Sequence, residues 1–252
     1  MSEVLLQARG ISKAFGGLQA VGDVSLDVRK GSLSALIGPN GAGKTTLFAL
    51  LSGFVLPDQG SVSFQGQNIT TWAPPARAQL GLARTFQIVQ PFAGQSVREN
   101  IAVGAHLRRP ARAEALSHAE QVAERVGLQD QLDKPAADLT VSGRKRLELA
   151  RALATEPSLL LLDEVLAGLN PQEVREVIPV VAGIAQSGVT VLMIEHVMQA
   201  VMHLAEHVWV LSQGRLIAEG APQVVTQDPQ VVEAYLGKGT AERLRQQGGT
   251  RG

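Results

Sequence analysis

Several features are scarce or missing in this 252-residue sequence, which has no cysteine, one tyrosine and no net charge. Without cysteine there is no disulfide framework and no thiolate metal site, which fits a reducing compartment. Because 23 Lys and Arg balance 23 Asp and Glu, no global field draws the chain to nucleic acid or to anionic lipid. Any anion must therefore be bound locally.

Long apolar runs are missing as well. The start, MSEVLLQARG, lacks the apolar core of a signal peptide, and no uninterrupted apolar run approaches the roughly eighteen residues of a membrane span. We therefore expect a soluble, cytoplasmic chain. Its length suffices for one large domain or for a domain with an inserted lobe.

The order of apolar patterns predicts an α/β fold. Short β-like runs separated by turn residues come first, and a helical pattern ending near Gly53 interrupts them. These runs cover residues 4–7, 25–28, 32–38 and 62–66. From about Pro91 to Ala154 the pattern is helical and poor in strands, which is typical of an inserted lobe.

Strands return in the second half of the chain. The runs at 158–164 and 189–196 are continuously apolar, as in strands buried on both faces of a parallel sheet. Between them, residues 171–186 have the pattern of a crossover helix. Residues 209–220 predict a hairpin that turns at Gln213-Gly214.

The segment GPNGAGKT at 38–45 matches G-x-x-x-x-G-K-[ST], with a β run before it and a helix after it. In this pattern backbone amides turn inward around phosphate oxygens, and the helix N-terminus adds its dipole. Lys44 would reach the β and γ phosphates, and the Thr45 hydroxyl would ligate Mg²⁺. The candidate contacts are Gly38, Pro39, Asn40, Gly41, Ala42, Gly43, Lys44, Thr45 and Thr46. The alternative is a chance glycine-rich turn.

The apolar run LLLLDE ends in two acids, Asp163 and Glu164. Asp163 would hold Mg²⁺, usually through water, and Glu164 could polarise an attacking water as a general base. Alone, such a run is more often a strand that leads into a turn. A phosphate loop upstream favours the functional interpretation.

Other residues are interpreted as structural. Phe48, Phe54 and Phe64 fit core positions. His203 and His207 stand four apart on an expected helix, a spacing that can hold a metal, but no third ligand is evident. A balanced chain without aromatic residues among its arginines is a poor nucleic-acid binder, so we expect no nucleic-acid partner.

With these motifs, residues 4–238 resemble the ATP-binding subunits of ABC transporters. The resemblance implies ATP and Mg²⁺, and an α/β fold with a P-loop NTPase (RecA-like) core. This core has a mainly parallel sheet, an N-terminal antiparallel β region and an inserted helical subdomain. We assign the core to residues 1–90 and 155–238, the helical subdomain to 91–154 and a flexible tail to 239–252.

Three further positions carry the resemblance, each with a simpler alternative. Gln87, in ARTFQ, is similar to the family's glutamine that senses Mg²⁺ and the attacking water; otherwise it is a surface glutamine. His196, in IEHVM, is similar to the family's switch histidine, which hydrogen-bonds the γ phosphate; otherwise it is a solvated histidine. Phe15, in SKAFGG, resembles the aromatic that stacks on adenine; otherwise it belongs to the core.

The segment LTVSG at 139–143 lies where the family has the pentapeptide LSGGQ, which caps a helix facing the γ phosphate on the other subunit of a dimer. The resemblance therefore assigns Thr140, Ser142 and Gly143 to a partner's ATP. Val141 and Ser142 replace two glycines that allow close backbone approach, so we expect a slower or looser dimer.

Three cations, Arg144, Lys145 and Arg146, crowd the start of the same helix, where the dipole makes each unfavourable unless an anion is near. A partner's ATP is one such anion. The alternative is a solvated basic face paired with Glu148.

The segments EVLAGLNP and AYLG, at 164–171 and 234–237, look like the ATPases of branched-chain amino-acid importers, and Asn170 stands where the family usually has Asp. This implies a motor subunit on the cytoplasmic face of the inner membrane. Its partners would be permease subunits, a second ATP-binding subunit that is either the same chain or a paralogue, and indirectly a periplasmic solute-binding protein.

Three alternatives stay open. Urea or amides are other solutes for the same kind of importer. A soluble ABC ATPase of DNA repair or translation would need a long coiled coil or two nucleotide domains in one chain, and the sequence has neither. A nucleotide-binding regulator without turnover is the third, and Glu164 argues against it.

Overall fold

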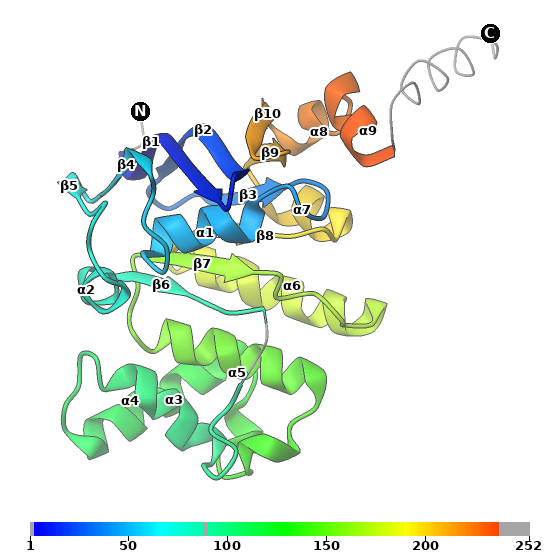
Figure 1. Cartoon of the computed structure of the whole chain (residues 1–252). Coiled ribbons are helices and arrows are strands. Elements are labelled where there is room, and N and C mark those ends of the chain that lie inside the picture. The colour runs from blue at the N-terminus through cyan, green and yellow to red at the C-terminus, as the bar shows by residue number, and fades with distance from the viewer. Residues whose placement is uncertain (1–2, 88–89, 237–252) are drawn as a thin grey trace, which may run out of the picture.

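The computed structural model describes residues 3–87 and 90–236. Within these residues two sheets lie one above the other, and a group of helices lies beyond the larger sheet (Figure 1). This arrangement confirms the expected α/β architecture, with a parallel sheet, an antiparallel β region and helices contributed by the middle of the chain.

The larger sheet has six strands in the order β10-β9-β3-β8-β7-β6. Its strands are β3 (Leu33–Ile37), β6 (Leu82–Arg84), β7 (Leu159–Asp163), β8 (Thr190–Ile194), β9 (His207–Ser212) and β10 (Arg215–Gly220). All neighbours pair in parallel except β9 and β10, which form the expected hairpin. The carboxyl ends of β3, β7 and β8 therefore meet at one edge of the sheet.

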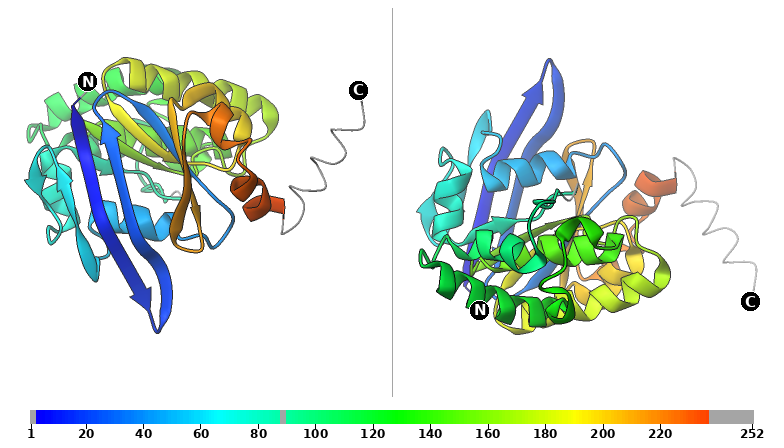
Figure 2. Two further views of the ribbon diagram at one scale, coloured as in Figure 1. Left: turned by 90° about the horizontal axis from the view of Figure 1, so that it is seen from above. Right: turned by 90° about the horizontal axis from the view of Figure 1, so that it is seen from below.

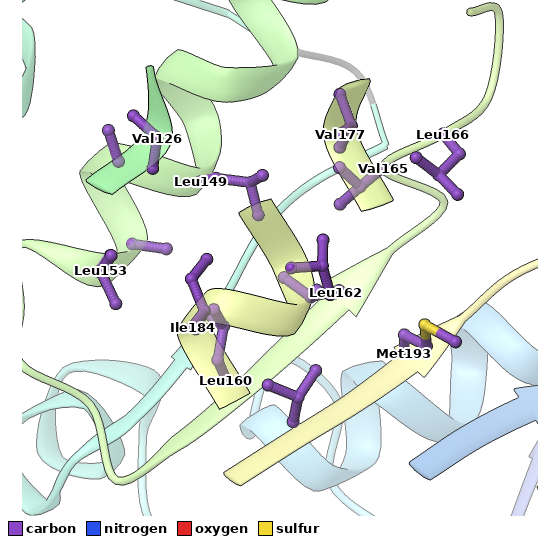
Figure 3. Packing of buried hydrophobic residues seen from close by; sticks show 14 of the residues in the cluster. Val126, Leu149, Leu153, Leu160, Leu162, Val165, Leu166, Val177, Ile184 and Met193 are labelled. Carbon is purple, nitrogen blue, oxygen red and sulfur yellow. The ribbon is translucent and has the colours of Figure 1, made fainter. Parts of the chain in front are cut away.

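Both faces of this sheet are buried, which explains the continuous apolar runs. In β7, Leu159 and Leu161 pack toward the antiparallel sheet, whereas Leu160 and Leu162 pack among the helices on the opposite face. Figure 3 shows Leu160 and Leu162 beside Leu149, Leu153 and Ile184, which come from two different helices.

The smaller sheet is antiparallel, in the order β2-β1-β4-β5. Its strands are β1 (Val4–Phe15), β2 (Leu18–Arg29), β4 (Gln59–Phe64) and β5 (Gln67–Asn68). The runs expected at 4–7 and 25–28 are only the outer ends of the β1–β2 hairpin, which turns at Gly16-Gly17. Interior glycines and register shifts break the alternation of this hairpin, so the sequence showed only part of it.

Helix α1 (Lys44–Ser52) lies between the two sheets (Figures 1 and 2). The middle of the chain forms α2 (Pro74–Leu80), α3 (Val97–Ala105), α4 (Arg112–Val126) and α5 (Val141–Leu153), with short 3₁₀ turns at Gln129–Gln131 and Ala136–Asp138. The remaining helices are α6 (Pro171–Gln186), α7 (Met198–Leu204), α8 (Pro222–Val225) and α9 (Pro229–Leu236). None of the helices in the described ranges is both long and apolar enough to cross a membrane.

Two sequence interpretations are wrong. Phe54 is not a core residue: it follows the end of α1, and 54% of it is exposed, whereas Phe48 and Phe64 are fully buried. His207 does not share a helix with His203, because α7 ends at Leu204 and His207 begins β9. The tail expected at 239–252 lies outside the described residues.

Candidate functional site

The glycine-rich loop joins β3 to α1, and two of its glycines are required by close backbone approach. A Cβ on Gly38 would lie 2.0 Å from the carbonyl oxygen of Leu211, and one on Gly43 would lie 2.2 Å from that of Ala20. Both also have positive φ, at 152° and 102°, which side chains disfavour. The loop is therefore held tightly against neighbouring strands.

Helix α1 begins directly after this loop with its N-terminus open. Gly43 is its N-cap, no side chain caps it, and its first turn contains no acid. The N–H groups and the positive end of the dipole therefore favour an anion. The ammonium of Lys44 crosses the loop and donates to the carbonyls of Gly38 and Pro39, at 2.8 and 3.0 Å. Burial lowers the pKa of Lys44, and the carboxylates of Glu164 and Asp163 oppose that effect.

The two acids follow β7 and differ in environment. Asp163 is 1% exposed, and its Oδ2 accepts a hydrogen bond from Arg84 at 2.7 Å. Its Oδ1 is buried with no hydrogen-bond partner among the described residues. Burial raises the pKa of Asp163, although the Arg84 guanidinium opposes this. Glu164 is more open and has a left-handed backbone, with φ of 49°, which turns the chain sharply at the end of the strand.

A single open cavity of about 1120 Å³ gathers most of the predicted residues. Its lining includes residues 38–46, Gln87, Glu164 and His196. The amide Nε2 of Gln87 donates to Oε2 of Glu164 at 2.6 Å, so the two side chains are paired. His196 is exposed at the end of β8. Asp163 is not among the lining residues of this cavity, and its Oδ2 bonds to Arg84.

Phe15 is not part of this lining. It lies at the tip of the β1–β2 hairpin, 49% exposed, with the ammonium of Lys13 5.6 Å from the centre of its ring. The alternative of a core phenylalanine is therefore wrong. Contact of this ring with adenine stays a prediction.

Thr140, Ser142 and Gly143 line a different cavity, of about 380 Å³, at the start of α5. The hydroxyl of Thr140 accepts from the backbone N–H of Gly143 at 3.1 Å and so caps the chain's own helix. Asn170 borders the same cavity and caps α6 through hydrogen bonds from Gln172 and Glu173. The described chain therefore does not bring its 139–143 segment to its own phosphate loop.

The three cations of α5 do not form one solvated face paired with Glu148. Arg146 pairs with Glu176 at 3.0 Å, and Glu148 pairs with Arg151 at 3.2 Å. Lys145 is buried, and its ammonium donates to the carbonyls of Gln87 and Glu164, both at 3.2 Å. Burial lowers the pKa of Lys145, an effect opposed chiefly by the carboxylate of Glu195.

Sequence reasoning missed several residues near the site. Arg84 and Lys145 contact the strand and loop that carry the acids, and Tyr235 of α9 borders the cavity. A cation inside the run LGLAR hinted at a buried Arg84. The segment AYLG contains Tyr235, but no sequence signal placed this side chain beside the phosphate loop.

A phosphate loop on an open helix N-terminus, with two acids at the end of a parallel strand that β8 separates from β3 in the same sheet, defines a P-loop ATPase. Residues 21–167 match the family described as "ABC transporter", and residues 215–241 match one described as "Branched-chain amino acid ATP-binding cassette transporter". The chain belongs to the ABC transporter family and is one of its ATP-hydrolysing cassettes.

Known proteins support this assignment over nearly the whole chain. The high-affinity branched-chain amino acid transport ATP-binding protein LivG of Salmonella typhimurium is 38% identical over 254 residues, covering 94% of this chain and all of the relative. BraF of Pseudomonas aeruginosa, which has the same description, is 37% identical over 255 residues with the same coverage. The resemblance inferred from the sequence is therefore confirmed.

Solved structures agree with these relatives. A nucleotide-free ATP-binding cassette from an ABC transporter superposes with a TM-score of 0.85 at 32% identity, covering 94% of this chain and all of the other. The ADP conformation of such a cassette gives the same values. Nucleotide binding is therefore a property of this fold.

Proposed function

We propose that this chain drives the uptake of branched-chain or other hydrophobic amino acids from the cytoplasmic face of the inner membrane. The observation that carries the proposal is the single cavity in which the phosphate loop meets Gln87, Glu164 and His196. The solute class rests on the LivG and BraF relatives and on the match of residues 215–241. Urea or amides are the alternative solutes.

We propose Mg²⁺ as the metal, held by Thr45, Gln87 and Asp163. These residues fit the ion, because Mg²⁺ takes oxygen ligands and Oδ1 of Asp163 is a buried carboxylate oxygen without a protein partner among the described residues. When bound, the ion neutralises charge on the β and γ phosphates.

The chain's own groups then have separate tasks in hydrolysis. The backbone N–H groups of residues 38–46, apart from Pro39, which has none, and the ammonium of Lys44 bind the polyphosphate, and Phe15 stacks on adenine. Glu164 accepts the proton of the attacking water, while its hydrogen bond from Gln87 fixes the carboxylate. His196 donates a hydrogen bond to the γ phosphate from the end of β8.

A second ATP-binding subunit, either the same chain or a paralogue, completes each site in this proposal. Its Thr140, Ser142 and Gly143 would cover the nucleotide from the start of α5. In support, these residues lie in a cavity separate from the phosphate loop of their own chain. Hydrolysis would separate the two chains again.

The permease subunits need a docking surface, and we assign it to an apolar groove of about 510 Å³ between the core and the helical subdomain. Phe54 and Phe86 border this groove and are 54% and 43% exposed. A chain of this family must attach to membrane-spanning subunits, and an apolar surface helix of a permease suits two exposed rings. A periplasmic solute-binding protein would act through those subunits.

Nucleotide binding tests the proposal first. The Lys44→Ala variant should bind a fluorescent ATP analogue about 10- to 100-fold more weakly, because it loses charge-assisted contacts to phosphate. Lys30→Ala is the matched control, since Lys30 is a surface lysine paired with Glu3. Unchanged nucleotide affinity and phosphate release in Lys44→Ala would contradict the proposal.

Transport tests the solute. Proteoliposomes containing the chain with its membrane subunits and solute receptor should take up labelled leucine in an ATP-dependent manner. Uptake of urea or acetamide without leucine uptake would replace the solute class and leave the motor function in place.

A further inference from the structure

A buried arginine beside the cavity has no task in the proposed hydrolysis. Arg84 is the last residue of β6, and its side chain is 8% exposed. Its Nη2 donates to Oδ2 of Asp163 at 2.7 Å. Removing two charges from water is costly, so such a pair contributes little to stability by itself.

The guanidinium of Arg84 is held on several sides. Its Cζ lies 5.9, 5.9 and 5.4 Å from the ring centres of Phe48, Phe54 and Phe86. Its Nη1 donates to the hydroxyl of Ser52, near the end of α1, at 3.2 Å. A planar cation packed against rings and fixed by two hydrogen bonds has little freedom to rotate.

Asp163 is correspondingly restrained. Its backbone N–H donates to the Thr85 hydroxyl at 3.0 Å, and Arg84 engages Oδ2. The other oxygen, Oδ1, is buried without a partner among the described residues. Leaving a buried carboxylate oxygen unpaired costs free energy, so a ligand that the described chain does not itself supply would be favourable at this oxygen.

We propose that Arg84 is a positioning residue for the metal: by holding Oδ2 of Asp163, it presents Oδ1 to Mg²⁺ bound with ATP. This inference rests on the proposed ATP hydrolysis at the site. The rings of Phe54 and Phe86, which border the proposed docking groove, pack against Arg84. The Arg84 side chain therefore contacts both the groove and the carboxylate of Asp163.

Arg84 also carries a positive charge, which by itself repels a metal ion. That charge is compensated by Asp163 in direct contact, whereas the orientation of the carboxylate has no other support from a side chain described here. When Arg84 is replaced, we therefore expect the lost orientation of the Asp163 carboxylate to weaken Mg²⁺ binding more than the lost repulsion from Arg84 strengthens it. Partners that orient a metal ligand are typically worth about 10- to 100-fold in metal affinity.

The test measures metal dependence separately from turnover. Binding of a fluorescent ATP analogue to the full chain is titrated with Mg²⁺, and the same binding is measured in excess chelator; bound Mn²⁺ is followed by electron paramagnetic resonance. In Arg84→Gln the half-saturating Mg²⁺ concentration should rise at least about tenfold, with affinity in chelator unchanged. Mn²⁺ should be bound correspondingly more weakly.

Two further variants separate positioning from folding. Arg77→Lys is the matched control, because Arg77 is fully buried and donates to the carbonyls of Leu50 and Leu51 but to no carboxylate. It should lower the thermal midpoint and keep the wild-type Mg²⁺ requirement. Arg84→Lys retains the charge without the planar guanidinium, so its half-saturating Mg²⁺ concentration should lie between those of wild type and Arg84→Gln. If Arg84→Gln does not fold, Arg84→Lys is used for the test in its place.

An unchanged or lower Mg²⁺ requirement in a folded Arg84 variant overturns the inference. An equal rise in Arg77→Lys also overturns it, because destabilisation alone would then explain the effect. If the wild-type chain binds no nucleotide, the failure belongs to the proposed function instead.

Discussion

Glu195 allows a quantitative prediction about stability and pH. It is 2% exposed, just before His196, and its Oε1 accepts from the backbone N–H of Leu166 at 3.0 Å. Its Oε2 has no partner among the described residues. Burial raises the pKa of Glu195 from 4.5 to about 7, with the Leu166 and His196 amides acting in the opposite direction.

Proton binding decides whether the free energy of unfolding rises or falls with pH. Between pH 4.5 and about 7 the folded chain holds this proton more tightly than the unfolded chain does, so the free energy of unfolding falls as pH rises through that window. Above about pH 7 the loss is complete and amounts to about 3 kcal/mol. Glu195→Gln keeps the acceptor for Leu166 and removes the buried charge.

The effect of the buried Glu195 charge on the free energy of unfolding is measured by urea unfolding of wild type and Glu195→Gln, without nucleotide or metal. The free energy of unfolding of the variant minus that of wild type should grow by about 2 kcal/mol between about pH 5 and about pH 8. Glu206→Gln is the control, because Glu206 is exposed and its replacement removes no buried charge. A difference that stays constant with pH, or one that shrinks, would refute the reasoning.

Two other substitutions separate chemistry from structure. Glu164→Gln should lower phosphate release at least about a hundredfold while nucleotide still binds, because it removes the proposed general base; ordinary turnover in this variant would assign the base elsewhere. Thr140→Ala should cost about 1 kcal/mol in urea unfolding, because α5 loses its N-cap. ATP affinity of the isolated chain should be unchanged in Thr140→Ala, and a loss there would mean that residues 139–143 act on the chain's own site.

The sequence was most informative where one physical constraint dominates. Strands β7 and β8 were expected at 158–164 and 189–196 and lie at Leu159–Asp163 and Thr190–Ile194, because burial on both faces leaves only apolar residues. The phosphate loop could also be predicted from the sequence, since Gly38 and Gly43 have no space for a Cβ and must be glycine.

The sequence was least informative where location decides a residue's surroundings. Phe54 has the composition of a core residue but follows the C-cap of α1 and faces a groove. Lys145 lies in a run of cations that resembles a solvated face, yet it points inward to the carbonyls of Gln87 and Glu164. The partners Arg84 and Asp163 are too far apart in the chain for a local pattern to join them.

The separate position of the 139–143 segment has a mechanical cause. Helix α5 is anchored by Leu149 and Leu153, which pack in the same core as β7 and α6, and by Lys145, which bonds to the loop after β7. These contacts tie α5 to the loop after β7, and its first turn lines a cavity separate from the chain's own phosphate loop. In the proposed function a second polypeptide supplies the lid for the nucleotide, and within each chain Lys145 would link the backbone carbonyls of Gln87 and Glu164 to the helix proposed to meet the partner.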